Sequence, residues 1–288
     1  MSLNFLALAG SLLASVGYCA DPAQGWLGYA MGVNPAKTGI ITFIEAYWVV
    51  PDNPTVDGAF FSPWFGIESS DNLNLIQPVN PWVSLASNHW EIYNEYYQWD
   101  PTYNYDSKAS DVSAGDVIYG SVTYNGDSAQ SYTMYHKDIT TGWSVSSTID
   151  VQKQSNGQLP KPTNSNHNHK KQYKQYTIAY FVFEKEARCD QYPPNDEVTF
   201  YNISIFYNNN KVSPQWTTAY VDDVCNNRAQ VVDEATIKIT WENKDHRKKK
   251  LIISLNFLPK YFSKLFNFVL VKKNYFLAYD DYFVCIRK

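Results

Sequence analysis

The feature that most limits the fold of this chain is a long succession of short β-type runs between residues 26 and 241. The runs are rich in Val, Ile, Thr, Tyr, Phe and Trp, and Asn, Asp, Gly and Pro separate them. None has the spacing of an amphipathic helix. Short strands divided by turn residues predict an all-β sandwich or barrel, and about 220 residues is an acceptable size for one such domain.

Nine of these runs predict strands by their composition and length. They cover residues 40–50, 60–67, 73–77, 90–99, 117–124, 131–136, 177–184, 198–207 and 235–241.

The first residues predict export. Residues 5–16 are apolar or small, and small residues follow at Gly17, Cys19 and Ala20, as in a cleaved secretory signal. The stretch is shorter than the roughly 20 apolar residues that span a bilayer. We therefore expect residues 1–20 to be a signal peptide and the protein to be secreted, either outside the cell or into an acidic lumen. The alternative is a buried first strand or helix.

Charge is distributed unevenly along the chain. Residues 244–288 hold 11 of the 24 Lys and Arg and 3 of the 28 Asp and Glu, which leaves residues 1–243 with a net charge of −12. Such an acidic domain repels nucleic acid and anionic membranes, so neither is expected as a partner. It also suits an acidic medium, where protonation relieves the self-repulsion. We expect a monomer.

Two segments differ from the rest of the chain. Residues 153–175 are polar and predict a mobile insertion. His167 and His169 within it could bind a metal, but no Cys or carboxylate stands beside them, so a solvated loop without metal is expected. Residues 244–288 form a basic, aromatic-rich tail that we place outside the folded domain, which then covers 21–243. Pro259 and two lysines argue against a membrane span in that tail.

Of the four cysteines, Cys189 and Cys225 are the two that lie in the body of the domain. In an oxidising compartment these two should form a disulfide; the alternative is a pair of free buried thiols. The sequence Asn202-Ile203-Ser204 is an N-glycosylation acceptor inside a predicted strand, so modification of Asn202 requires that strand face to be exposed.

A carboxylate ends the predicted strand 177–184. Strand alternation puts Ile178, Tyr180, Val182 and Glu184 on one face, and that face is apolar except for Glu184 and the Tyr180 hydroxyl. A carboxylate in such surroundings suits proton exchange with a reacting water. The alternative is a strand-end glutamate that simply reaches solvent.

An amide occupies a similar position in the predicted strand 73–77. Gln77 shares a face with Leu73 and Leu75, so its side chain lies on an otherwise apolar surface. A side-chain amide does not titrate and can donate a hydrogen bond to a developing oxyanion at any pH. The alternative is a core glutamine with satisfied hydrogen bonds.

These features occur within a series of motifs, and with them the chain resembles the glutamic peptidases of the eqolisin type. The matching stretches are Trp26-Leu27-Gly28, Tyr47-Trp48-Val49-Val50-Pro51, Trp64-Phe65-Gly66-Ile67-Glu68, Leu75-Ile76-Gln77, Tyr93-Asn94-Glu95-Tyr96-Tyr97, Ala114-Gly115-Asp116 and Ala179-Tyr180-Phe181-Val182-Phe183-Glu184.

The resemblance implies a two-sheet antiparallel β-sandwich of the concanavalin-like jelly-roll type, acting as a secreted acid endopeptidase without a cofactor. Glu184 would activate water for attack on a peptide carbonyl, and Gln77 would stabilise the oxyanion. Within the matched motifs, substrate-binding residues are expected at Trp64, Glu68, Glu95 and Tyr97.

Some positions depart from the family pattern. Ser69 stands where a second glycine is usual, Glu68 replaces an aspartate, and Tyr180-Phe181 replace Glu-Trp. These changes would either alter specificity or mark a relative that kept the sandwich and lost the reaction. Two further alternatives are a carbohydrate-binding, lectin-like sandwich, since aromatic residues make up 16% of the chain, and an inert structural protein.

Overall fold

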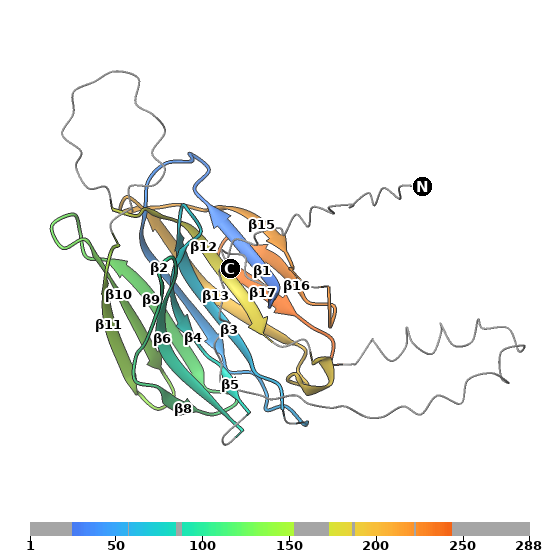
Figure 1. Cartoon of the computed structure of the whole chain (residues 1–288). Helices are drawn as coiled ribbons and strands as arrows, with labels where there is room; N and C mark the ends of the chain where they lie inside the picture. The colour runs from blue at the N-terminus through green and yellow to red at the C-terminus, as the bar shows by residue number, and fades with distance from the viewer. Residues whose placement is uncertain are drawn as a thin grey trace, which may run out of the picture.

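The chain folds into two antiparallel β-sheets that pack face to face (Figure 1). The computed structural model describes residues 25–56, 58–84, 88–152, 173–185, 188–221 and 223–243. The expected signal peptide (1–20), the tail (244–288) and residues 153–172 of the polar insertion lie outside these ranges. Within them, no helix reaches the length and hydrophobicity that a membrane crossing requires.

The first sheet, called the inner sheet below, has nine strands. In spatial order they are β15 (Gln215–Ala219), β1 (Trp26–Val33), β12 (Tyr176–Lys185), β3 (Phe61–Ser69), β4 (Asn74–Val79), β6 (His89–Trp99) and β5 (Trp82–Val83), with β7 (Thr102–Asp106) and β8 (Ser110–Val112) both paired to β6.

The second sheet, called the outer sheet, has eight strands. In order they are β11 (Ser144–Asp150), β10 (Ser131–Asp138), β9 (Val117–Tyr124), β2 (Ile41–Val49), β13 (Glu197–Tyr207), β17 (Thr236–Thr240) and β16 (Arg228–Asp233), with β14 (Asn210–Lys211) paired to β13. The one helical element among the described residues is the 3₁₀ turn η1 (Cys189–Gln191).

The predicted fold class is confirmed, and each of the nine predicted runs is a strand within a few residues of its predicted bounds. The main apolar core lies between the sheets and takes side chains from both, for example Phe65 and Phe181 from the inner sheet and Trp48 and Phe200 from the outer sheet. The core reaches the end of the domain, because Trp241 is buried and stacks on Phe183 at 4.4 Å.

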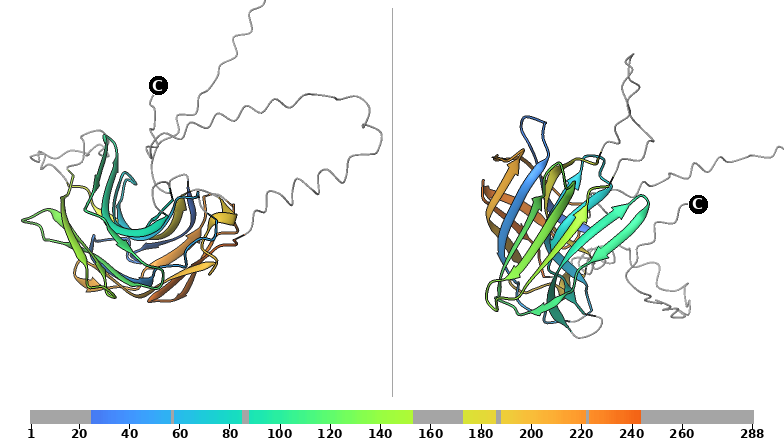
Figure 2. Two further views of the ribbon diagram at one scale, coloured as in Figure 1. Left: turned by 90° about the horizontal axis from the view of Figure 1, so that it is seen from below. Right: turned by 90° about the vertical axis from the view of Figure 1, so that its left-hand side faces the viewer.

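The inner sheet is strongly curved, and its face turned away from the outer sheet is concave (Figure 2, left). A second, smaller apolar cluster lies on this concave face and contains only inner-sheet residues, namely Trp26, Trp64, Leu75, Val79, Tyr180 and Val182. Alternation explains the two clusters, since Phe181 and Phe183 of β12 point to the core while Tyr180 and Val182 point to the concave face.

The polar insertion is shorter than expected at its C-terminal end. Lys174 is buried, its ammonium forms an ion pair with Asp71 at 3.0 Å, and it donates a hydrogen bond to Asn74. Its backbone N–H also bonds to the carbonyl of Gln152 at 2.9 Å. Residues 173–175 therefore belong to the folded domain, where Asp71 and Asn74 compensate the buried charge of Lys174.

His136 of β10 is completely buried between the sheets, and burial lowers its pKa from 6.5 to about 4. Its Nδ1 lies 3.0 Å from the carbonyl oxygen of Tyr93, so Nδ1 carries the proton of the neutral ring. Nε2 is buried and has no hydrogen-bond partner among the described residues. Protonating Nε2 would thus put an unsatisfied donor and a charge into the core.

This histidine should make the fold less stable in acid. Because its pKa is depressed, the unfolded chain binds a proton more readily, and the free energy of unfolding falls as the pH drops from 6.5 to about 4. The loss from this residue at pH 4 should be about 3 kcal/mol. Urea denaturation at pH 7 and at pH 4 measures how much unfolding free energy is lost between the two pH values. That loss should be about 3 kcal/mol smaller in His136→Gln than in the parent. Identical losses in the two proteins would contradict this assignment.

Candidate active site

Gln77 lies near the middle of the inner sheet, on its concave face. It is 4% exposed and stands on β4 directly opposite Glu95 of β6. Its Nε2 donates a hydrogen bond to Glu95 Oε2 at 2.7 Å. Its Oε1 is buried and has no partner among the described residues. The bond to Glu95 therefore holds the amide in one orientation.

Gly66 allows this arrangement. A Cβ at this position would lie 2.5 Å from the carbonyl oxygen of Ile76 and 2.9 Å from Gln77 Cβ. Any larger residue would push β4 away from β3, so the close approach of these strands beside Gln77 requires glycine.

Glu184 comes from the other side of β3. It is the penultimate residue of β12, it is half-buried, and it stands opposite Trp26 of β1 and Ser62 of β3. Alternation with Tyr180 and Val182 puts its side chain on the concave face. Gln77 and Glu184 thus share one face of one sheet.

The two residues are offset along the strands. Tyr180 of β12 pairs with Gly66 of β3, and the β3–β4 register puts Gly66 opposite Gln77 of β4. Tyr180 and Gln77 are therefore at the same height along the strands. Glu184 lies four residues further along β12. On a flat sheet four residues span about 13 Å. The inner sheet is curved (Figure 2), and both residues lie on its concave side.

Tyr93 links the surroundings of both residues. It stands on β6 opposite Val79, between the levels of Gln77 and Glu184. Burial raises the pKa of its hydroxyl well above 10, and the carboxylates of Glu95, Asp106, Glu91 and Glu184 raise it further. Since electrostatic interactions weaken with distance, Glu95 and Glu184 both lie close enough to act on this one hydroxyl.

The predicted substrate-binding residues differ in exposure. Tyr97 and Glu95 are half-buried on the concave face, and the Tyr97 ring packs on Trp99 at 4.4 Å. Trp64 and Glu68 are fully buried; Trp64 packs on Trp26 at 5.0 Å, and Asn72 donates a hydrogen bond to Glu68 at 2.8 Å. In this structure, Trp64 and Glu68 therefore lie beneath the surface that a ligand would touch.

Two features of the site were not anticipated from the sequence. Glu95 bonds to Gln77, whereas it was expected to contact substrate, and the alternating pattern of β6 could have indicated only its face, not its partner. Tyr180 replaces a family glutamate and is fully buried, with its ring 4.8 Å from Trp26 and 6.0 Å from Tyr29. An aromatic cluster thus fills the position next to Gly66.

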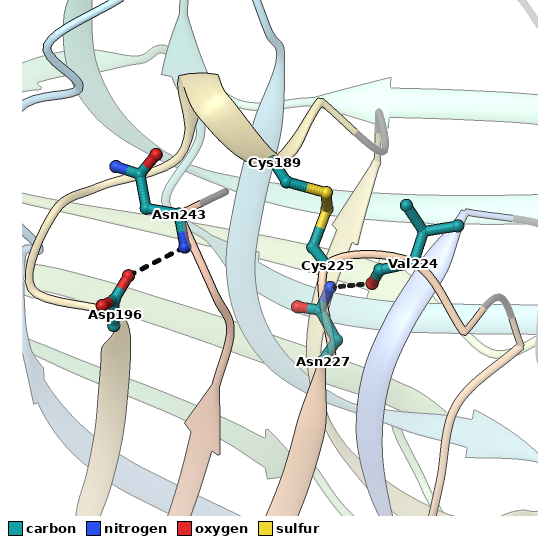
Figure 3. Close-up of a disulfide and its surroundings, with 6 residues drawn as sticks. All are labelled: Cys189, Asp196, Val224, Cys225, Asn227 and Asn243. Carbon is teal, nitrogen blue, oxygen red and sulfur yellow. Dashed lines mark hydrogen bonds between the residues drawn. A yellow bond between two sulfur atoms is a disulfide. The ribbon is translucent and has the colours of Figure 1, made fainter. Parts of the chain in front are cut away.

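The predicted disulfide between Cys189 and Cys225 is present (Figure 3). It joins η1, which follows the Glu184 strand, to the loop before β16. Two hydrogen bonds lie in its surroundings: Asn243 N–H bonds to Asp196 at 3.0 Å, and Asn227 donates to the Val224 carbonyl at 2.8 Å. The bridge therefore restrains the chain immediately after the strand that carries Glu184.

Removing the bridge should lower stability. Closing a loop of 36 residues contributes about 3–4 kcal/mol in the chain-entropy model. We expect Cys189→Ser/Cys225→Ser to lose about 3 kcal/mol of unfolding free energy in urea. Reducing agent should destabilise the parent similarly and leave the double variant unchanged; a double variant as stable as the oxidised parent would contradict the expectation.

Asn202 lies at an irregular position of β13. Its side chain is exposed, its φ is 53°, and the β13–β2 register shifts between Tyr201 and Ser204. This bulge turns the asparagine out to solvent, which is the exposure that glycosylation requires. Its modification stays a prediction.

Comparisons with known proteins agree with this fold. A model of the peptidase A4 family matches residues 24–244. Scytalido-glutamic peptidase, solved with a transition state analog inhibitor, has a TM-score of 0.54 and 19% identity, covering 76% of this chain and 98% of that chain. SCP-B, an eqolisin solved with the tripeptide Ala-Ile-His, has a TM-score of 0.51 and 18% identity, with coverages of 76% and 98%. No curated protein matches by sequence.

Proposed function

The chain belongs to the peptidase A4 family, and from that membership we propose that it is a glutamic-type endopeptidase that hydrolyses polypeptides in acid. The observation that carries the proposal is the buried Gln77 amide on the concave face, oriented by its bond to Glu95, with Glu184 on the same face. In this proposal Glu184 activates a water on that face, and the Gln77 amide binds the carbonyl oxygen of the substrate.

Glu184 acts as general base and then as general acid. Its carboxylate takes a proton from the water as the water oxygen attacks the peptide carbonyl carbon. The same carboxyl group then gives that proton to the leaving nitrogen, and the C–N bond breaks. The carboxylate is regenerated after each cycle, so neither metal nor cofactor is required.

Gln77 stabilises the oxyanion of the tetrahedral intermediate. Its Nε2 carries two hydrogens, and one of them bonds to Glu95. The second is available to the substrate oxygen as negative charge develops there. A neutral amide suits acid conditions because it neither titrates nor repels the nearby Glu184 carboxylate. Glu95 is a positioning residue in this scheme, since it fixes the orientation of the amide.

The concave face suits an extended polypeptide. Tyr97 and Glu95 are half-buried beside Gln77, so a substrate can contact them. Trp64 and Glu68 are buried beneath them and are part of the packing under that face. The peptide bond to be cut would lie between Gln77 and Glu184. We propose Trp64, Glu68, Glu95 and Tyr97 as the residues that shape substrate binding.

The protein's place of action follows from the same features. The disulfide favours an oxidising, extracellular location. We propose secretion through a signal peptide at residues 1–20 and action as a monomer in an acidic medium. In this proposal the domain covers 21–243, and the tail 244–288 takes no part in catalysis.

A carbohydrate-binding sandwich is the second candidate. It is favoured by the aromatic side chains that lie half-buried on the concave face, such as Tyr93, Tyr97 and Trp99, because flat rings stack on sugars. Such a protein needs no reacting water between Gln77 and Glu184.

Digestion of an acid-denatured protein at pH 3–4 distinguishes the candidates. The peptidase proposal expects new internal fragments, visible by mass spectrometry, from the purified parent chain and none from Glu184→Ala. A parent that binds oligosaccharides and yields no fragments would support the second candidate. Equal cleavage by parent and variant would remove Glu184 from the mechanism.

A further inference from the structure

His89, Glu91 and Asp111 come together at one end of the concave face. His89 and Glu91 alternate along β6 and so share a face, and Asp111 of β8 stands directly opposite Glu91. His89 Nε2 lies 3.5 Å from Glu91 Oε2 and 3.4 Å from Asp111 Oδ1. One ligand atom from each of the three side chains falls within 4.8 Å of the others.

These distances are those of ion pairs between His89 and the two carboxylates, and they also match two ligands of one metal ion. An imidazole nitrogen bonded to a carboxylate oxygen usually lies about 2.7–2.9 Å away. Two ligands on a tetrahedral zinc ion, each about 2.0–2.2 Å from it, are separated by about 3.4 Å. The two measured separations from Nε2 match this second value.

The charges around the cluster also call for a cation. Carboxylates directly opposite each other on neighbouring strands repel and destabilise the pair. Glu91 faces Asp111 in this way, and the negative charge of Asp106 also acts on Glu91. His89 offsets part of this repulsion, and a divalent ion would offset more of it and hold the three-residue strand β8 against β6.

We propose that His89, Glu91 and Asp111 bind a divalent transition-metal ion of the zinc type. The imidazole ligand favours such an ion over calcium or magnesium, which prefer oxygen ligands alone. The Asp111 side chain is 84% exposed, so the fourth position faces solvent and can take water. The site is separate from Gln77 and Glu184, and peptide hydrolysis does not require it.

Calorimetric titration of the full chain with zinc chloride at pH 7 tests the proposal. We expect one ion per chain in the parent. Removing a group that only supports a metal ligand typically weakens metal binding about tenfold or more. His89→Ala and Asp111→Asn remove ligands themselves, so each should weaken zinc binding by at least that much. Asp52→Asn, which changes an exposed carboxylate outside the cluster, should bind as the parent does. Because Asp111 is exposed, its variant should fold normally.

His167 and His169 provide the competing explanation and a second control. The variant His167→Ala/His169→Ala should keep the site, and zinc should raise the melting temperature of this variant but not that of His89→Ala. Loss of zinc binding in the His167/His169 variant, or unchanged binding in His89→Ala, would overturn the proposal. Calcium binding as tight as zinc binding and independent of His89 would overturn it as well.

Discussion

Glu184→Gln is expected to lower kcat for hydrolysis of a denatured protein by about three to four orders of magnitude, the upper part of the range for general acid–base catalysis. The glutamine keeps the size of the side chain and cannot accept the proton of the attacking water. Initial rates at pH 3–4, with the fragments quantified by mass spectrometry, provide the measurement.

The matched control for this variant is Glu45→Gln. Glu45 is a half-buried glutamate on β2 of the outer sheet, where Tyr119 donates a hydrogen bond to it at 2.9 Å. It should keep the parent's kcat. Both variants should melt within a few degrees of the parent, since neither change removes core volume. A Glu184→Gln rate within tenfold of the parent would exclude Glu184 as the base.

Gln77→Ala is expected to lower kcat by about two to three orders of magnitude, because one oxyanion donor typically contributes 2.7–4 kcal/mol to transition-state stabilisation. The loss should fall mainly on kcat and leave KM close to that of the parent, since the oxyanion forms only in the transition state. Steady-state kinetics on a short peptide substrate separates the two constants. Gln230→Ala, an exposed glutamine on β16, is the control. A variant whose defect is confined to KM would make Gln77 a substrate-binding residue instead.

Much of the fold could be predicted because the long strands can be recognised from their own residues. Strands such as β12 and β13 are at least ten residues long and rich in β-branched and aromatic residues, which is typical of strands. Strands such as β7 and β11 were missed. Their residues are mainly exposed or half-buried, so their sequences carry little hydrophobic periodicity.

The site was predictable in its residue types and less so in its contacts. The faces of Gln77 and Glu184 follow from alternation, which is local. The bond between Gln77 and Glu95 depends on the register between β4 and β6, and register is set by turns and packing that a single sequence does not display. The burial of Lys174 has the same cause, since Asp71 and Asn74 lie about 100 residues away along the chain.

Family membership and activity are separate matters for this chain. At 18–19% identity the solved relatives establish the sandwich, and catalysis depends on a few side chains. The departures Tyr180 and Glu68 are both buried next to the proposed site. Tyr180 adds a ring to the aromatic cluster with Trp26, which makes this part of the concave face less polar than a glutamate would.

The central claim is that Glu184 and Gln77 act on the same water and the same carbonyl. The most direct test is kcat/KM for the parent, Glu184→Gln, Gln77→Ala and the double variant on one peptide at pH 3–4. Residues that work as a unit have strongly non-additive effects, so the double variant should be about as slow as the slower single variant. Two effects that multiply in full would show that the side chains act independently, and would contradict a shared site.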